Sequence, residues 1–255
     1  MATNPHIAVI GGGPAGLRAA ESCAAGGARV SVFEAKRSAA RKLLVAGYGG
    51  LNLTHGEPLE DFVTRYVGPN LPAEHFARMI RAFSPDDLRQ WAGQLGIATF
   101  EQRTGRVYPK EMKAAPLVRH WLKRLRAQEV EFHVNHRLQS LQPSHGGIEL
   151  QFENEFSKVF DAVILALGGA SWAKTGSDGT WPPLLEAHEI RINSWEPANC
   201  GWELHWPREI VKCIEGKPLK NLRVSAGPVS ILGELMPTRY GLEGGAIYQL
   251  GPLLR

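Results

Sequence analysis

The strongest constraint on the fold is an apolar segment at residues 6–10 that leads directly into a Gly-x-Gly-x-x-Gly turn made by Gly11, Gly13 and Gly16. In a β-α-β unit, the first glycine permits a tight turn, the second lets the backbone approach a pyrophosphate, and the third lets the helix lie close to the strand. The helix N-terminus then directs free N–H groups and a positive dipole at the phosphates. The motif therefore predicts a bound dinucleotide.

The residues after the turn support this interpretation. A helix is predicted over residues 14–27, with Ala15 and other small residues where it faces the sheet, and a strand over residues 29–33 ends at Glu34. Glu34 follows Gly11 by roughly 20 residues, where an acidic side chain accepts hydrogen bonds from the adenosine ribose. An acidic residue that merely ends a strand of an ordinary β-α-β unit is the alternative.

Size and composition limit the class of protein. The 255 residues, of which 44% are hydrophobic and 21% charged, are typical of one large globular domain or two modest ones. A net charge of +4 is too small to demand nucleic acid as a partner. We find no signal peptide, no apolar run near the ~20 residues of a membrane span, and no cysteine pair spaced for a redox or zinc site. We therefore expect a cytoplasmic protein with no membrane partner.

The region between the first β-α-β unit and residue 128 divides into a glycine-rich segment and a helical one. Residues 36–57 are too rich in Leu, Val and Gly for a solvated linker, so we interpret them as a loop that wraps a ligand, with a structural Ω-loop as the alternative. The helical region, about 58–128, is predicted to contain a hairpin at 99–109 and a final amphipathic helix at 113–128. The basic residues of that helix are better explained by a solvated face than by nucleic-acid binding.

From residue 129 the pattern changes to strands. The predicted strands are 130–135, 136–142, 147–153, 156–160 and 161–167. The middle three form an antiparallel meander, and the last is an apolar run of the kind buried on both faces of a parallel sheet. Gly168 and Gly169 follow it, where a ligand can approach the backbone. This order resembles the Rossmann-like α/β FAD domain of glutathione-reductase-like flavoproteins, a parallel sheet plus a three-strand meander.

We expect two domains. Residues 1–193 would form the cofactor domain, with the helical insertion at about 58–128, and residues 194–255 would form part of a β-rich substrate domain. The clearest strands of the second domain are 222–226, 229–232 and 235–238. Counting strands leaves the cofactor domain without a C-terminal return segment, so we expect that segment to be missing.

Several motifs together resemble the YhiN-like family of bacterial flavoproteins, also called aminoacetone-oxidase-like. They are KLLVAG at 42–47, GGLNLTH at 49–55, TGRVYP at 104–109, KAAPL at 113–117, LALGGASW at 165–172, TGSDG at 175–179, PANCG at 197–201, GKPLK at 216–220 and YGLEGGAIY at 240–248. The resemblance implies an FAD-dependent oxidoreductase, an oxidase or a reductase, that acts on a small organic substrate. Relatives include reductases of steroid-type enones, and NAD(P)H is an optional donor.

The resemblance also implies the residues that bind FAD. The glycine turn would hold the pyrophosphate, Glu34 the ribose, the segment 42–54 the flavin side, and Leu138 the adenine through its backbone. The predicted cofactor-binding residues are Gly11, Gly13, Pro14, Ala15, Gly16, Glu34, Ala35, Lys36, Lys42, Leu43, Gly49, Asn52, Leu53, Thr54, Leu138, Ala166, Leu167, Gly168 and Gly169.

Two departures from the family leave other functions open. Many relatives have Gly-Gly-Arg-Cys-Asn in the flavin loop, whereas this chain has GGLN at 49–52. The family's chains also continue well beyond the segment that matches Arg255. The alternatives are a truncated, catalytically inactive nucleotide-binding fragment, an NAD-only dehydrogenase, and a flavoprotein that acts on tRNA. Substrate, electron acceptor and oligomeric state are not predicted.

No catalytic side chain is predicted, because in flavin enzymes the cofactor carries the redox chemistry. His133 and His136 lie in or beside one strand, and strand alternation would point them to opposite faces, which argues against a metal site. Arg106 and Tyr108 would share one face of the hairpin, where they could meet an anionic ligand. Asp178 could cap the helix that follows it or contact a ligand.

Overall fold

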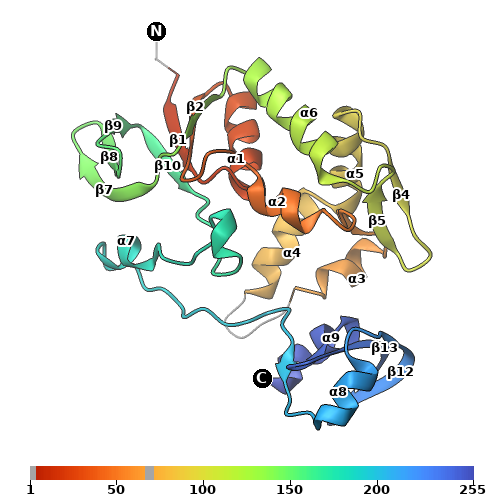
Figure 1. Ribbon diagram of the computed structural model, residues 1–255. Coiled ribbons are helices and arrows are strands. Elements are labelled where there is room, and N and C mark those ends of the chain that lie inside the picture. Colours follow the sequence, from red (N-terminus) through yellow and green to blue (C-terminus); the bar gives the residue numbers. More distant parts are fainter. Residues whose placement is uncertain (1–3, 67–71) are drawn as a thin grey trace. The chain divides into compact units, whose positions relative to one another are not determined.

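The computed structural model describes residues 4–66 and 72–255. The chain forms two compact units, residues 1–193 and residues 194–255. The first unit holds a parallel sheet with helices on one face and a meander on the other (Figure 1). Of the predicted helical insertion, residues 67–71 lie outside the described part of the chain.

The first unit is built around a four-stranded parallel sheet in the order β10-β1-β2-β6. Its strands are β1 His6–Ile10, β2 Arg29–Glu34, β6 Glu131–Val134 and β10 Ala162–Leu165. Helix α1, Pro14–Ala25, connects β1 to β2. Alternation along β2 separates two cores, because Val30 and Val32 face the helices while Phe33 faces the meander. The predicted α/β fold with a parallel sheet is confirmed.

The meander covers the face of the sheet opposite α1. Its strands are β7 Leu138–Ser144, β8 Gly147–Phe152 and β9 Ser157–Phe160, paired antiparallel in that order. Leu150, Phe152 and Phe160 are almost fully buried against Phe33 of the sheet. The aromatic rings stack closely, with the centroids of Phe33 and Phe152 4.5 Å apart. The three-strand meander predicted from the sequence is therefore present.

Between β2 and β6 the chain forms mostly helices and one small antiparallel sheet. The elements are α2 Arg41–Ala46, β3 Thr54–His55, α3 Leu59–Val63, α4 Ala73–Ala82, α5 Pro85–Gln94, β4 Thr99–Glu101, β5 Arg106–Pro109 and α6 Ala114–Ala127. Helix α5 begins at a capping box in which Ser84 and Asp87 satisfy each other's backbone N–H groups. Leu117, Trp121 and Leu125 of α6 are buried in the core shared with α1.

Three sequence expectations are wrong at the level of single elements. The segment 36–57 is not one loop, because the helix-forming run at 41–46 makes α2 and Thr54 pairs with Val107 of β5. The strand expected over 161–167 ends at Leu165. His133 and His136 do not face opposite sides of a strand.

The two histidines lie together because the strand ends between them. β6 stops at Val134, and Asn135 adopts a left-handed φ of 57°, which interrupts the alternation of side chains. The rings of His133 and His136 are 5.5 Å apart, and both lie against Phe33. Burial, and next the neighbouring His136, lower the pKa of His133. Among the described residues, no three His, Cys, Asp or Glu side chains gather where they could hold a metal ion.

The first unit ends with short elements after β10. They are a 3-10 turn, Ala173–Thr175, and helix α7, Pro182–Glu186. Within the described residues of the chain, we find no helix with the length and hydropathy needed to cross a bilayer.

The second unit contains an antiparallel sheet in the order β11-β14-β13-β12. Its elements are β11 Trp202–Glu203, α8 Arg208–Ile214, β12 Leu219–Ala226, β13 Val229–Thr238, β14 Gly241–Glu243 and α9 Gly245–Leu254. The strands expected at 229–232 and 235–238 are one continuous strand, β13, in which Gly233 pairs with Leu222 next to a register shift in the pairing with β12. Ala246, Ile247 and Leu250 of α9 supply the buried apolar face of this unit.

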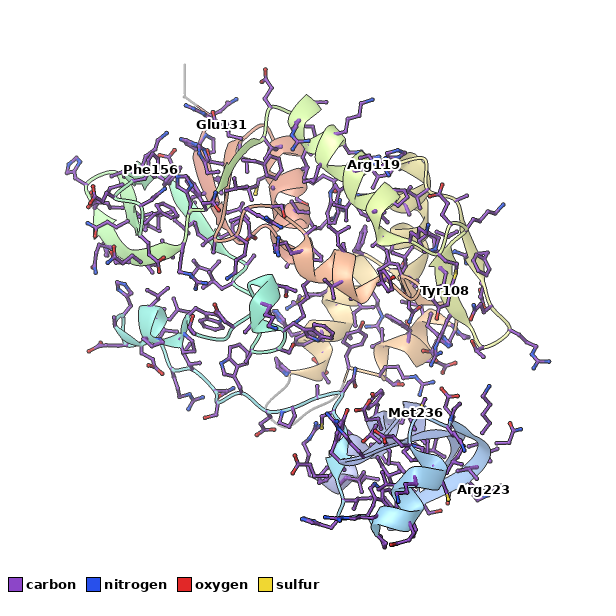
Figure 2. The ribbon with its side chains drawn as sticks, viewed as in Figure 1. Tyr108, Arg119, Glu131, Phe156, Arg223 and Met236 are labelled. Atoms are coloured by element: carbon purple, nitrogen blue, oxygen red, sulfur yellow. The ribbon has the colours of Figure 1, made fainter. Side chains whose placement is uncertain are left out.

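A polar network lies on the meander-facing side of the parallel sheet and centres on the side chain of Glu131, which is labelled in Figure 2. Arg29 Nη2 donates to Glu131 Oε1 at 2.8 Å, and Ser31 Oγ donates to Glu131 Oε2 at 3.0 Å. The Ser31 hydroxyl proton is donated to the Glu131 carboxylate, which can only accept. His6 Nε2 is therefore the donor in the 2.9 Å hydrogen bond between His6 and Ser31 Oγ. The Arg29 hydrogen bond is the main reason that the pKa of Glu131 falls to about 2.

This carboxylate should make stability depend on acidic pH. The pKa of Glu131 is about 2 in the folded chain against an ordinary value of 4.5, so the folded state is favoured above pH 4.5 and loses that advantage as the pH falls towards 2. In urea titrations across this range, wild type should lose stability more steeply than Glu131→Gln. The exposed Glu111→Gln is the matched control and should follow wild type. Parallel curves for wild type and Glu131→Gln would contradict the expectation.

Candidate functional site

A cavity of about 650 Å³ opens at the carboxyl ends of the parallel strands. The ends of β1, β2 and β10 contribute Ile10, Phe33 and Leu165 to its wall. Its volume is in the range of small-molecule and cofactor sites, and its location follows the rule that open α/β sheets bind ligands beyond their carboxyl edge.

The glycine turn forms one wall of the cavity, and the structural requirement for glycine differs among its three positions. Gly11 has a φ of +111°, and a Cβ atom at this position would overlap the carbonyl oxygen of Ala166. A Cβ atom on Gly16 would overlap the carbonyl oxygen of Gly11, so α1 packs directly on the turn. Gly13 differs, because no heavy atom lies within 4 Å of where its Cβ would be. The turn therefore leaves open space at Gly13, which lines the cavity at the start of α1.

The carboxylate of Glu34 lies at the end of β2 and also lines the cavity. The Gly12 N–H donates to its Oε2 at 2.9 Å, and the Lys36 N–H donates to its Oε1 at 2.8 Å. These bonds fix the orientation of the carboxylate. Because each carboxylate oxygen has two lone pairs, further acceptor capacity remains for hydroxyl donors in the cavity.

The side chain of Lys42 connects α2 to the segment that follows β10. Its Nζ donates to the carbonyl oxygen and Oγ of Ser171 at 3.1 and 2.7 Å, and to Oγ of Ser177 at 3.3 Å. The Ser177 hydroxyl in turn donates to the Gly169 carbonyl at 2.9 Å and accepts from the Gly169 N–H at 3.2 Å. These contacts hold Gly168 and Gly169 against the cavity.

The structure brings most of the sequence-predicted site residues to one cavity. Those that line it are Gly11, Gly13, Pro14, Ala15, Glu34, Ala35, Lys42, Leu138, Ala166, Leu167, Gly168 and Gly169. Those outside its lining are Gly16, Lys36, Leu43, Gly49, Asn52, Leu53 and Thr54. Two of these still shape the site. Gly16 lets α1 pack directly on the glycine turn, and the Lys36 N–H fixes the carboxylate of Glu34.

The predicted flavin-side residues outside the lining lie in α2 and in the segment that connects α2 to α3. Leu43 and Leu53 pack against the core shared by α1 and α6. The Asn52 side-chain amide faces the carbonyl oxygens of Thr54 and Val107 at 2.9 and 3.3 Å. Contact of these residues with a cofactor remains a prediction from the family resemblance.

An ion pair on the cavity wall was not predicted from the sequence. Arg137 Nη2 donates to Asp178 Oδ2 at 2.8 Å, and Asp178 Oδ1 accepts from the N–H and hydroxyl of Thr180 at 3.3 and 2.9 Å. Burial opposes ionisation of Asp178, but the hydrogen bonds from Arg137 and Thr180 outweigh it and hold its pKa below the usual range. Asp178 does not cap the next helix, because α7 has Trp181 at its N-cap. The position of Arg137, immediately before the predicted adenine contact Leu138 at the start of β7, was the available sequence signal.

The hairpin candidates lie away from the cavity. Val107 is fully buried between Arg106, which is exposed, and Tyr108, which is half-buried. Neither Arg106 nor Tyr108 is among the residues that line the cavity.

Comparison with curated proteins finds a reductase among the relatives of this chain. Over 257 aligned residues, the chain is 28% identical to a 3-dehydro-bile acid delta(4,6)-reductase from Clostridium scindens. The alignment covers 96% of this chain and 59% of the relative, so the chain spans little more than half the length of that curated protein.

Solved structures with a similar arrangement have low sequence identity. One is the 3-ketosteroid-delta4-(5alpha)-dehydrogenase of Rhodococcus jostii RHA1, with a TM-score of 0.48, 16% identity, and coverage of 66% of this chain and 46% of that chain. Another is THI4 of Thermovibrio ammonificans, with a TM-score of 0.44, 18% identity, and coverage of 74% and 63%.

A family model also matches most of the chain. The model of the HI0933-like protein Rossmann domain matches residues 5–241, which include the glycine turn, the parallel sheet and the meander. Because this match covers nearly the whole chain, the chain belongs to the HI0933-like protein Rossmann domain family.

Proposed function

We propose that the cavity binds FAD and that the chain is the cofactor-binding part of an FAD-dependent oxidoreductase. The observation that carries the proposal is the convergence of Gly13, Glu34 and Leu138 on one cavity at the carboxyl edge of the sheet. Open space at Gly13 suits a pyrophosphate, and the fixed carboxylate of Glu34 suits a ribose diol. The match to the HI0933-like family supports the same conclusion.

The residues present fit this cofactor. The first turn of α1 offers N–H groups to the pyrophosphate, and the start of β7 at Leu138 offers backbone to the adenine. Gly168 and Gly169, held by Ser177, line the approach from β10. Bound FAD would supply hydride or electron transfer, and the protein would orient it and exclude water.

The substrate we propose is a small organic molecule of the steroid-enone type, with NAD(P)H as the electron donor. The support is the 28% identity to a bile acid reductase across 96% of this chain. Within the family, we assign the chain to the YhiN-like branch that has GGLN at 49–52. Residues 1–193 would be the FAD domain and residues 194–255 part of the substrate domain. The free thiols Cys23, Cys200 and Cys213 are consistent with a cytoplasmic location.

An absorbance spectrum of the purified protein tests the proposal. We expect a flavin spectrum, and mass spectrometry of the released ligand should identify FAD. A colourless preparation that releases NAD would favour an NAD-only dehydrogenase. Protein that stays apo after refolding with excess FAD, while a longer chain extended past Arg255 turns yellow, would favour an inactive fragment.

A further inference from the structure

Arg41 is a cation on the cavity wall without an acidic partner. The only hydrogen bond of its side chain among the described residues is a long one, from Nη1 to Ser38 Oγ at 3.4 Å. The Nε atom is buried and has no partner at all. Because an unpaired buried guanidinium N–H is costly, this arrangement indicates that a ligand completes the hydrogen bonding of Arg41.

The other charged side chains of the cavity are already engaged. Arg137 pairs with Asp178 at 2.8 Å and lies 3.8 Å from Glu153. The carboxylate of Glu34 is held by two backbone N–H groups. Lys42 is occupied by the serine oxygens that tie α2 to the segment after β10. Arg41 is therefore the cation of this wall that is most available to an anion.

The backbone before Arg41 is fixed directly to the glycine turn. The Ala40 N–H donates to the Gly12 carbonyl at 2.8 Å, and Ala40 is 2% exposed. Ala40 also adopts a left-handed conformation, with φ 58° and ψ 21°, which is unfavourable for alanine and persists only where the surroundings impose it. Arg41 therefore directly follows a residue that is hydrogen-bonded to the glycine turn, and the same turn leaves the open space at Gly13.

We propose that Arg41 binds the diphosphate of the dinucleotide and is its principal side-chain counter-ion. The inference rests on the proposed function, since the ligand is the diphosphate of FAD. A guanidinium presents its donors in a planar fork that matches phosphate oxygens, and charge-assisted bonds of this kind are about twice as strong as neutral ones. The α1 N-terminus and Arg41 would then approach the diphosphate from two elements, with Gly13 providing the space.

Binding of ADP and of adenosine to Arg41→Met tests the role of the diphosphate. Both ligands fill the adenosine end, but only ADP carries the diphosphate. The affinity of Arg41→Met for ADP should fall by about 10- to 100-fold, the loss expected for a charge-assisted hydrogen bond, while its affinity for adenosine changes little. Arg37→Met is the matched control, because Arg37 is exposed, carries the same charge and does not line the cavity. It should bind ADP as wild type does.

Three results would overturn the inference. They are equal losses for ADP and adenosine in Arg41→Met, an equal loss of ADP affinity in Arg37→Met, and an unchanged ADP affinity in Arg41→Met. If Arg41→Met does not fold, Arg41→Lys keeps the charge without the fork and should show a smaller, ADP-specific loss. Wild type that binds neither FAD nor ADP would instead refute the proposed function. Wild type that binds both, with variants that do not discriminate between ADP and adenosine, would refute the role of Arg41 alone.

Discussion

Replacing Gly16 with alanine should destabilise the folded chain by about 3 kcal/mol or more, at the upper end of what overpacking produces. A Cβ atom on Gly16 would overlap the carbonyl oxygen of Gly11. That oxygen cannot move aside easily, because the Gly11 N–H is bonded to the Phe33 carbonyl at 2.8 Å and so belongs to the rigid edge of the sheet. Relief would require α1 to move away from β1, which would uncover Leu17, a fully buried residue of the main core.

Gly13→Ala is the matched control in the same turn. Gly13 has extended backbone angles, φ −77° and ψ 179°, and nothing lies within 4 Å of the new methyl group. Its folding stability should stay within about 1 kcal/mol of wild type, since only the N-cap preference changes. FAD affinity should fall, because the methyl group occupies the space proposed for the pyrophosphate. Urea denaturation of both apo variants gives the comparison. Equal stability losses for Gly13→Ala and Gly16→Ala would contradict this account of the turn.

The parts of the fold that were predictable depend on short-range patterns. Each predictable feature follows from a local requirement for backbone conformation or for side-chain burial. The features are the turn at Gly11–Gly16, the acidic end of β2 at Glu34 and the apolar strand before Gly168. Their positions along the chain also bring them to the same edge of a parallel sheet. Twelve of the predicted cofactor-binding residues line the cavity for this reason.

The parts that were not predictable depend on contacts between distant segments. Arg137 and Asp178 meet only because the segment after β10 returns across the start of β7. The availability of Arg41 becomes visible only after the partners of the other charged side chains are known. His133 and His136 come together because Asn135 adopts a left-handed conformation, for which the sequence offered only a weak signal.

Glu21 gives the second large expected effect, because it joins three helices in the core. Its side chain is 7% exposed and accepts hydrogen bonds from Arg18 Nη1 at 2.7 Å, Trp91 Nε1 at 2.9 Å and Arg124 Nη1 at 3.1 Å. These donors come from α1, α5 and α6. Burial alone would raise the pKa of Glu21, but the hydrogen bonds outweigh burial and hold that pKa below its ordinary value.

Glu21→Ala should reduce the free energy of unfolding by about 3 kcal/mol, measured by urea denaturation near pH 7. This is the lower end of the range for a broken buried pair, because Arg18 and Arg124 are 40% and 24% exposed and can still be hydrated. Most of the loss should come from the Trp91 N–H, which is left without an acceptor in the core. Glu21→Gln keeps an acceptor for Trp91 and should lose less.

The matched control is Glu60→Ala, which removes a carboxylate that pairs with Arg81 on the surface. Solvent already hydrates both partners of this pair, so its removal should change stability little. A double-mutant cycle between Glu21→Ala and Trp91→Phe, each of which removes the hydrogen bond between the two side chains, should show a coupling energy of about 1 kcal/mol or more. A loss in Glu21→Ala no larger than that in Glu60→Ala would mean that α1, α5 and α6 are held together by apolar packing alone.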